Sequence, residues 1–207
     1  MLMNKLAILG ASGHGRVLAD MAELIGWQAV IFFDDAWPKI TYNSHWPVAG
    51  NSDDLLNRLS DFDGVIVGIG NSSIRLAKQT LLTSHCAPLI SLIHPSAQIS
   101  RYAHVGTGTA IMAGATVGVD CTIGDACIIN TQASIDHDCE LANGIHISPM
   151  VALAGGVSIE QGAWVGIGAS VRELITIGSG AIVGAGAVVV KPVLPKTCVI
   201  GNPARAL

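Results

Sequence analysis

Branched aliphatic residues recur at every sixth position through the second half of the chain. The series consists of Ile93, Ile99, Val105, Ile111, Val117, Ile123, Ile129, Ile135, Leu141, Ile147, Leu153, Ile159, Val165, Val171, Ile177, Val183 and Val189. An unbroken period of this length is typical of a repeat architecture. It predicts a parallel β-helix in which each hexad forms one face and three hexads form one coil, with a little under six coils in all.

A second series of mostly small residues stands four positions after each member of the first. It consists of Ala97, Ala103, Thr109, Ala115, Cys121, Cys127, Ala133, Cys139, Ile145, Val151, Val157, Ala163, Ala169, Ile175, Ala181, Ala187 and Val193. A large and a small residue together fill a narrow triangular interior. The three cysteines in this series are therefore expected to be buried, inert thiols.

The first 92 residues have a different pattern, in which short apolar runs alternate with segments of helical spacing. Strands are expected at Lys5–Leu9, Ala29–Phe33, Gly64–Gly68 and Leu89–Ile93, and helices at Arg16–Ile25, around Ser52–Leu59 and at Ser72–Leu82. This order implies right-handed βαβ units and a small, Rossmann-like parallel sheet. We therefore predict two domains, an α/β domain at residues 1–92 and a β-helix at residues 93–207.

Composition narrows the class of protein. The net charge of −4 argues against nucleic acid as the main partner. No uninterrupted apolar run is long enough to cross a bilayer and no basic, apolar leader begins the chain, so we expect neither a membrane span nor export. The five cysteines show no metal-binding spacing, and their odd number fits free thiols in the cytoplasm.

The segment Asp136-His137-Asp138 is the most distinctive polar motif of the predicted β-helix. His137 is the third residue of its hexad, outside both inward series, and should face outward. A histidine that titrates near neutral pH suits a general base, and a neighbouring carboxylate can fix its tautomer and raise its basicity. Asp138 is the first candidate for that carboxylate, and Asp136 is the second. A hydrophilic surface corner is the alternative interpretation.

Metal binding is a further alternative, because some hexapeptide-repeat proteins are zinc carbonic anhydrases. Here His137 and His146 occupy different places in their hexads, and His94 and His104 lie more than a coil earlier, so no metal site is predicted. Cys139 is not expected to act as a nucleophile because it belongs to the inward series.

Gly155 stands three hexads after His137, in the equivalent place one coil along. Its N–H is placed to donate to a developing oxyanion, although Gly155-Gly156 also suits a simple turn.

A glycine-rich loop, Gly10–Gly15, follows the first predicted strand. It is not the dinucleotide fingerprint, because Ser12 stands where the second glycine belongs, and about 92 residues are too few for a full dinucleotide fold. Such a strand-to-helix turn can still hold phosphates at a helix N-terminus. Gly68–Asn71 ends another strand and either lines the same cleft or forms a plain turn.

Taken together, the hexads, the α/β domain with "GASGHG", the central "IDHD" and "GNPA" at Gly201–Ala204 resemble one family. This family comprises the NeuD/PglD-type sugar acyltransferases with a left-handed β-helix. The resemblance covers essentially the whole chain. It implies an acetyl-CoA-dependent enzyme without a metal, active as a homotrimer that holds acetyl-CoA between neighbouring coils.

The resemblance also implies roles for individual residues. His137 matches the general base and Asp138 its orienting partner, although relatives often have glutamate at the latter position. Asn130 matches a residue of the acceptor site, His146 a histidine near the acetyl thioester, and Gly155 a glycine whose N–H meets acetyl-CoA. The nucleotide-sugar site is expected to include Ser12, Gly13, His14, Asp34, Asp35, Gly70 and Asn71. Ala185 and Lys191 are assigned to the acetyl-CoA site. Near the last coil, Lys191, Lys196 and Arg205 either contact the phosphates of CoA or are ordinary solvated cations.

The predicted reaction is acetyl transfer to the 4-amino group of a UDP-linked amino-trideoxy sugar, as in UDP-N,N′-diacetylbacillosamine synthesis for a bacterial glycan or glycoprotein. Sialic acid O-acetylation and GDP-perosamine N-acetylation are the rivals within the class. A scaffold that binds sugar nucleotides without catalysis is the alternative from another class.

Overall fold

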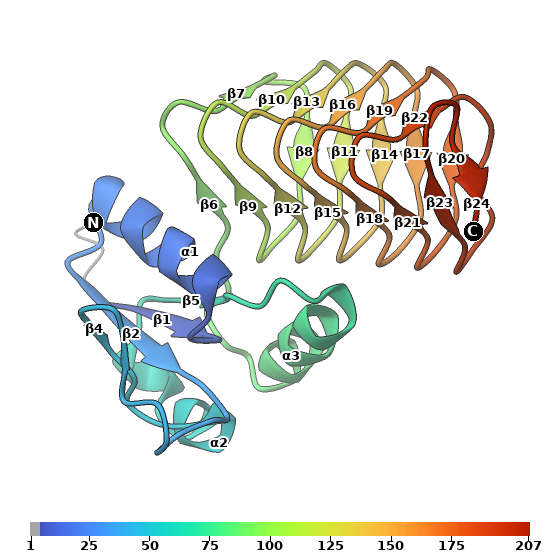
Figure 1. Cartoon of the computed structure of the whole chain (residues 1–207). Coiled ribbons are helices and arrows are strands. Elements are labelled where there is room, and N and C mark those ends of the chain that lie inside the picture. The colour runs from blue at the N-terminus through green and yellow to red at the C-terminus, as the bar shows by residue number, and fades with distance from the viewer. Residues whose placement is uncertain (1–4) are drawn as a thin grey trace. The chain divides into compact units, whose positions relative to one another are not determined.

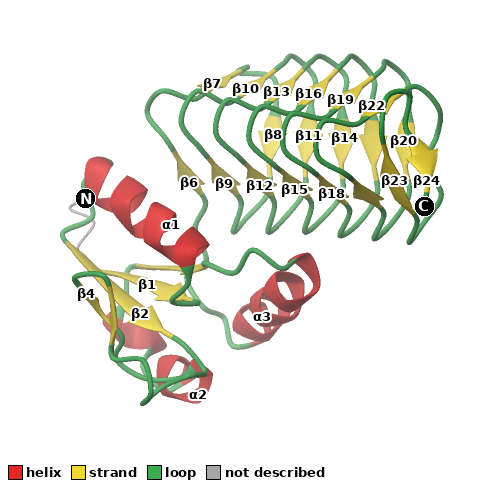
Figure 2. Ribbon diagram, in the orientation of Figure 1, coloured by secondary structure: helices red, strands yellow, loops and turns green. Residues whose placement is uncertain are grey.

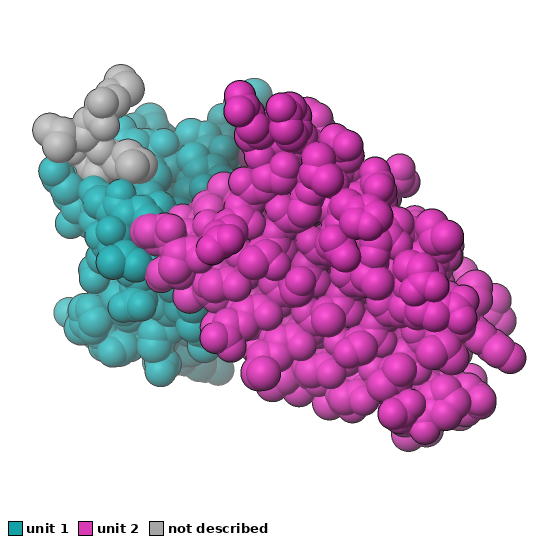
Figure 3. Space-filling model, turned by 90° about the horizontal axis from the view of Figure 1, so that it is seen from above, with its two compact units in different colours: residues 1–92 teal, residues 93–207 magenta. Residues whose placement is uncertain are grey.

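The computed structural model describes residues 5–207. The chain divides into two compact units, residues 1–92 and residues 93–207, which Figure 3 shows in different colours.

The first unit is built on a parallel sheet. The strands β1 (Lys5–Leu9), β2 (Ala29–Phe33) and β5 (Gly64–Val67) lie in the order β2-β1-β5, with β1 in the centre. The helices are α1 (Gly13–Leu24), α2 (Ser52–Leu56) and α3 (Ser72–Ser84), with a 3₁₀ turn at Leu59–Asp61. A short hairpin of β3 (Tyr42–Asn43) and β4 (Trp46–Pro47) follows β2. The predicted alternation of strands and helices is confirmed (Figure 2).

Two predicted segments in this unit differ from the structure. Helix α1 begins at Gly13 rather than Arg16, so that Gly13, His14 and Gly15 form its first turn. The run Leu89–Ile93 is not a strand of the sheet, since only Leu89 bridges to Val65. Its last two residues, Leu92–Ile93, form β6, which belongs to the second unit's sheets. The run is apolar except for Ser91, and this pattern concealed the break because its two ends pack in different sheets.

Close packing between α1 and the sheet depends on Gly15. A Cβ atom at Gly15 would collide with the carbonyl oxygen of Gly10 and lie 2.9 Å from the ring of Phe32. Helix α1 therefore starts directly against the end of β1, which is the reason a third glycine is needed in such turns. The loop between Leu9 and α1 is consequently short and rigid.

The second unit is a parallel β-helix with three flat faces (Figure 1). One sheet contains β7 (Gln98–Ile99), β10 (Thr116–Val117), β13 (Ser134–Ile135), β16 (Ala152–Leu153), β19 (Ser170–Val171) and β22 (Val188–Val189). The second contains β8 (His104–Val105), β11 (Thr122–Ile123), β14 (Glu140–Leu141), β17 (Ser158–Ile159) and β20 (Thr176–Ile177). The third contains β6, β9 (Ala110–Ile111), β12 (Ile128–Ile129), β15 (His146–Ile147), β18 (Trp164–Val165), β21 (Ile182–Val183), β23 (Cys198–Ile200) and the antiparallel β24 (Arg205–Ala206). We call these the first, second and third faces.

Neighbouring coils are offset by three hexads, as the sequence pattern predicted. Ser134 pairs with Ala152 and Ile135 with Leu153, and the same offset holds along all three faces up to the last coil. In the last coil the offset is shorter, because Ile182 pairs with Cys198 and Ile177 bridges to Val193. Both inward series are buried from Ile111 onward and form one continuous core. Ile93, Ile99 and Val105 of the first coil are only partly covered.

From Gly108 to Gly186 each corner of the β-helix contains a residue in the left-handed conformation. These positions also recur every six residues, and many are glycines, such as Gly144 and Gly156. Asp138 is one of the exceptions, with a φ of 57°. Aspartate is among the few residues that adopt this conformation readily, so the chain can place a carboxylate at a corner directly after His137.

Candidate functional site

His137 and Asp138 form a pair at the corner between the first and second faces. Nδ1 of His137 lies 2.7 Å from Oδ2 of Asp138, and the two side chains are 55% and 64% exposed. The left-handed turn at Asp138 bends its side chain back onto the imidazole. Asp136 has a different role, because its Oδ1 accepts the backbone N–H of His137 at 2.8 Å. His137 therefore faces outward as expected, and Asp138 is the acid that contacts its ring.

The acids beside His137 tune its basicity. The hydrogen bond that His137 donates to Asp138 raises the pKa of His137 above its usual 6.5, and the charge on Asp136 raises it further. A carboxylate at Nδ1 holds the proton of the neutral ring there and leaves the lone pair on Nε2. This arrangement can serve as a general base, and that role of His137 stays a prediction.

Gly155 lies directly against the His137 ring from the next coil. A Cβ atom at this position would be 2.5 Å from Cε1 and 2.6 Å from Nε2 of His137. The adjacent coils are joined here by the hydrogen bond from Gly156 N to His137 O at 2.9 Å. Of the two glycines, only Gly156 has the positive φ that a turn requires. Gly155 instead leaves space for the imidazole, and donation by its N–H to acetyl-CoA stays a prediction.

A second group of predicted residues lies on the third face and at the corner where that face meets the first. Asn130, His146 and Ala185 line one pocket of about 280 Å³, together with Trp164, Ile167 and Ile182. Nδ2 of Asn130 lies 3.4 Å from Nε2 of His146. The indole of Trp164 stacks on His146, with ring centroids 6.0 Å apart and planes 20° apart. This largely apolar pocket with a few polar groups suits the thin, mixed chain of a thioester donor.

The structure of one chain does not bring these two groups together. Asn130 follows β12 at one edge of the first face, and His137 follows β13 at the other edge. At the rise of a β-strand this separation is on the order of 15 Å. His137 and His146 of one chain therefore lie too far apart to act on the same acetyl group.

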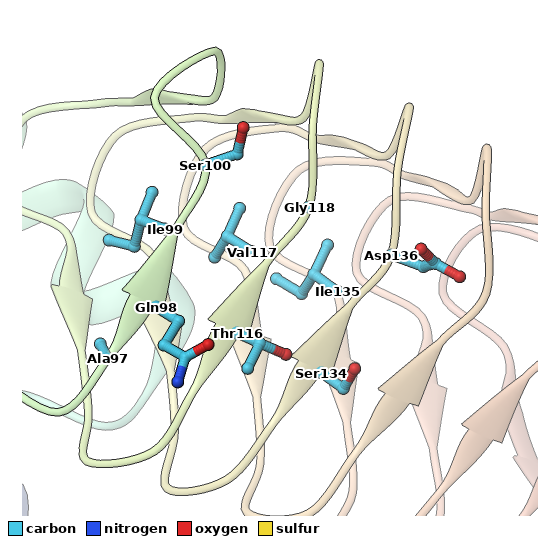
Figure 4. A pocket seen from close by; sticks show the side chains of 10 residues that line it. All are labelled: Ala97, Gln98, Ile99, Ser100, Thr116, Val117, Gly118, Ser134, Ile135 and Asp136. Atoms are coloured by element: carbon cyan, nitrogen blue, oxygen red, sulfur yellow. The ribbon is translucent and has the colours of Figure 1, made fainter.

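The first face has an open depression beside the His137 corner (Figure 4). It has a volume of about 660 Å³, and its polar lining residues are Gln98, Ser100, Thr116, Ser134 and Asp136. The lining offers hydroxyl, amide and carboxylate groups and contains no cation. It suits a neutral hydroxylated ligand or a polar protein face better than a phosphate.

In the first unit, three of the predicted nucleotide-sugar residues line one pocket. Ser12, Asp34 and Asp35 surround a space of about 270 Å³ near the end of β1, with Ile69, Ile74 and Lys78 among the other walls. Pockets at the carboxyl ends of parallel strands are the usual ligand sites of such sheets. The sequence prediction missed Lys78, because it lies on α3, 43 residues from the acid it contacts.

The two acids of this pocket have different partners. Asp34 accepts the backbone N–H groups of Ala11 at 2.7 Å and Ala36 at 2.9 Å, which ties it to the glycine loop. Asp35 accepts from Lys78 Nζ at 2.6 Å and from Ser52 N at 3.0 Å. Burial raises the pKa of Asp35, but the hydrogen bonds from Lys78 and Ser52 outweigh it and lower that pKa to about 2. Asp35 is therefore ionised near neutral pH.

The remaining predicted residues of this unit lie around the same loops. Gly13 and His14 belong to the first turn of α1, whose N-cap is Ser12. Asn71 is the N-cap of α3 and accepts from Ile74 N at 3.1 Å, so it has a structural role in the structure as it stands. Gly70 has open space where a Cβ would be. Buried Arg75 holds this turn by donating to the carbonyls of Ile69 and Gly70.

Other predicted features fall outside these groups. Lys191 is exposed in the loop after β22 and does not line the pocket that contains Ala185. Within residues 5–207 no group of three histidine, cysteine or acidic side chains is placed to hold a metal ion. Cys139 is buried, and burial raises the pKa of its thiol to about 11, which is unfavourable for a nucleophile. None of the described helices has the length and apolar character needed to span a bilayer.

Trp164 is the residue of the second unit that sequence reasoning missed. It stands one coil after His146 and pairs with it directly between β15 and β18. Because one coil is three hexads long, the sequence was sufficient to predict that Trp164 lies beside His146.

A parallel β-helix with a histidine–carboxylate pair at a corner defines the class of hexapeptide-repeat acyltransferases.

Comparison with known proteins supports this class. Residues 5–80 match the family model described as the PglD N-terminal domain. Over 116 residues the chain is 36% identical to UDP-N-acetylbacillosamine N-acetyltransferase of Bacillus subtilis, and this match covers 54% of the chain and 52% of that relative. The chain therefore aligns with about half the length of this curated relative.

Two of the solved structures that match nearly the whole chain contain CoA or acetyl coenzyme A. One is the acetyltransferase domain of PglB from Neisseria gonorrhoeae in complex with acetyl coenzyme A, with 38% identity, a TM-score of 0.93 and 98% of both chains covered. The other is a variant of perosamine N-acetyltransferase from Caulobacter crescentus in complex with CoA and GDP-perosamine, with 36% identity, a TM-score of 0.93 and coverage of 98% and 96%. The chain belongs to the NeuD/PglD-type sugar acyltransferase family, and its β-helix is left-handed as in that family.

Proposed function

We propose that this protein transfers the acetyl group of acetyl-CoA to the 4-amino group of a UDP-linked amino-trideoxy sugar. The 2.7 Å contact between His137 Nδ1 and Asp138 Oδ2 carries the proposal, because it leaves Nε2 as an exposed base. The PglB acetyltransferase domain solved with acetyl coenzyme A supports the donor, and the perosamine N-acetyltransferase variant solved with CoA and GDP-perosamine supports the amine acceptor.

The chemistry follows from the lone pair on Nε2. The neutral sugar amine attacks the thioester carbonyl carbon, the C–N bond forms, and an amine proton moves to Nε2 of His137. Collapse of the tetrahedral intermediate breaks the C–S bond, and the CoA sulfur takes a proton as it leaves. The ion pair with Asp138 stabilises the imidazolium that forms between these steps. Sugar amine and acetyl-CoA thus give the acetamido sugar and CoA, with no acyl-enzyme.

The pocket of the first unit is proposed to bind the nucleotide part of the acceptor. Ser12, Gly13 and His14 begin α1, where backbone N–H groups favour phosphate, and the pocket walls supply Asp34 and Asp35 for polar contacts with the nucleoside. Gly70 and Asn71 adjoin the pocket wall at Ile69. A GDP-linked amine is the second candidate, because a relative 36% identical over nearly the whole chain was solved with GDP-perosamine.

We further propose that the active protein is a homotrimer. One chain holds His137 at one edge of the first face and the pocket of Asn130, His146 and Ala185 at the other edge. A cyclic trimer would join the His137 corner of one subunit to the His146 pocket of the next. Acetyl-CoA would then lie between subunits, with Gly155 beside its thioester and Lys191 near its phosphates. None of the five cysteines, which all lie in the described part of the chain, forms a disulfide, and this fits the reducing cytoplasm, where we place the protein.

Thiol release from acetyl-CoA tests the proposal. The assay compares UDP-4-amino sugars, GDP-4-amino sugars and free sialic acid as acceptors, and mass spectrometry identifies the product. His137→Ala should lower kcat by about 10²- to 10⁴-fold, the usual contribution of a general base. His104→Ala, which removes another exposed histidine of the β-helix, is the matched control and should retain activity.

Each outcome of this assay has a clear meaning. Release with one amino sugar alone identifies the acceptor. Release with sialic acid alone would replace N-acetylation by O-acetylation. Nucleotide-sugar binding without release by a folded protein would favour a scaffold and contradict the enzymatic proposal.

A further inference from the structure

The side-chain amide of Asn130 has a fixed orientation. Its Oδ1 accepts the backbone N–H of Thr131 at 2.8 Å and lies 3.4 Å from the Thr131 hydroxyl. A backbone N–H can only donate, so the atom facing it must be the amide oxygen. The amide NH₂ group is therefore the end of Asn130 that faces His146.

This orientation determines the tautomer of His146. The amide nitrogen of Asn130 lies 3.4 Å from Nε2 of His146, at the long end of the hydrogen-bond range. An amide NH₂ offers hydrogens and no lone pair, so it disfavours a proton on the nitrogen it faces. We infer that Asn130 is a positioning residue that holds His146 as the neutral Nδ1–H tautomer, so that His146 meets its ligand as an N–H donor.

Trp164 keeps the imidazole in place for this role. Its indole stacks on the His146 ring at 6.0 Å, and its Nε1–H donates to Ser148 Oγ at 2.8 Å. Ser148 is only 5% exposed, so the indole is anchored in the wall of the pocket. The plane of the imidazole is thereby fixed between the amide of Asn130 and the indole.

His137 and His146 consequently present opposite groups to a ligand. In His137 the Nδ1–H donates to the carboxylate of Asp138, and the lone pair on Nε2 is the group presented to a ligand. In His146 the amide of Asn130 faces Nε2, so that Nδ1–H is the donor of the neutral ring. One histidine is set up as a base and the other as a donor. The use of that donor toward the carbonyl oxygen of the acyl donor rests on the proposed function.

The tautomer itself is measured without any substrate. The protein is labelled with ¹⁵N-histidine, and His146→Ala assigns the signals of residue 146. At a pH where the ring is neutral, the Nδ1 of His146 should carry the proton and Nε2 should show the shift of a bare, pyridine-type nitrogen. A proton on Nε2 in the unaltered protein would overturn the inference.

Asn130→Asp provides the sharpest variant, because it replaces a donor by an acceptor of the same shape. The carboxylate should draw the proton to Nε2, whereas Asn130→Ala should leave a mixture of tautomers. Trp164→Phe, which retains an aromatic ring on His146, should keep the Nδ1–H tautomer. An unchanged spectrum in the folded Asn130→Asp variant would contradict the role of Asn130.

Kinetics separates this inference from the proposed function. If His146 donates to the reacting carbonyl, Asn130→Asp should lower kcat by about 10²-fold with a smaller effect on KM. The expected spectrum without acetyl transfer to any acceptor would refute the proposed function and leave the tautomer assignment intact. Acetyl transfer with the Nε2–H tautomer would do the reverse.

Discussion

The imidazole of His137 lies where a side chain at residue 155 would begin. The Cβ position of Gly155 is 2.5 Å from Cε1 of His137. The ring of His137 therefore occupies the space that a side chain at residue 155, one coil further along, would need. The absence of a side chain at Gly155 therefore determines where the proposed base can stand.

Gly155→Ala should lower kcat without unfolding the protein. Gly155 has no positive φ, and the atoms that the new methyl group meets belong to an exposed ring that can swing away. The ring must move by about 1 Å, and displacements of this size cost about 10²-fold in rate. We expect kcat to fall by about that factor while the melting temperature changes little, as measured by steady-state kinetics and circular dichroism.

The effect of Gly155→Ala should disappear when His137 is already absent. The double variant Gly155→Ala/His137→Ala is expected to be no slower than His137→Ala alone. A further loss in the double variant would show that residue 155 acts on catalysis separately from His137, for example through its N–H.

Asp138→Asn should move the pH dependence of the reaction. The hydrogen bond that His137 donates to Asp138 is the largest cause that raises the pKa of His137. Because the neutral ring is the base, activity falls as the pH drops through this pKa. Without the carboxylate the pKa falls, so the acid limb of kcat/KM should shift to lower pH. The plateau should drop by about tenfold or more, because the tautomer is no longer held.

Asp136→Asn is the matched comparison for that pH profile. Asp136 raises the pKa of His137 only through its charge and contacts the backbone N–H rather than the ring. Its replacement should shift the acid limb in the same direction by a smaller amount. A larger shift than in Asp138→Asn would identify Asp136 as the orienting acid.

Lys78→Met should change how stability depends on pH. The pKa of Asp35 is lowered from 3.8 to about 2, so the folded protein gains stability above pH 3.8 that is lost as the pH falls through about 2. Losing the Lys78 partner should weaken this dependence. Because Asp35 is about half exposed, the difference should not exceed about 1 kcal/mol.

Urea unfolding at pH 5 and pH 3 measures this change. Lys39→Met removes another, exposed lysine of the first unit and should leave the pH dependence as it was. If both variants changed the pH dependence of stability equally, the effect of Lys78 would come from the net charge of the protein rather than from its contact with Asp35. Nucleotide-sugar binding by Lys78→Met should also be weaker, since Lys78 lines the pocket.

Co-expression of two inactive variants tests whether a site spans two subunits. If His137 of one chain works with His146 of the next, His137→Ala and His146→Ala chains mixed in one trimer should restore activity. When equal amounts of the two variants assemble at random, roughly a quarter of the interfaces contain both His137 and His146. Each variant alone should stay far below this level, and no recovery in a mixed trimer would place the two histidines in different sites.

The sequence by itself determined the β-helix and the His137–Gly155 relationship. A six-residue period is a local property, because each hexad buries one large and one small residue whatever the rest of the chain does. Once three hexads make a coil, residues three hexads apart must be neighbours, which places Gly155 beside His137 and Trp164 beside His146. The same period makes His137 face outward.

Tertiary structure decided what the period does not encode. The pairing of Lys78 with Asp35 joins α3 to the end of β2, 43 residues apart, and depends on how helices pack on the sheet. The left-handed turn at Asp138 decided that this acid, rather than Asp136, contacts the imidazole. The orientation of the Asn130 amide follows from two hydrogen bonds to Thr131, because rotation of a terminal amide is set by its contacts and leaves no trace in the sequence pattern.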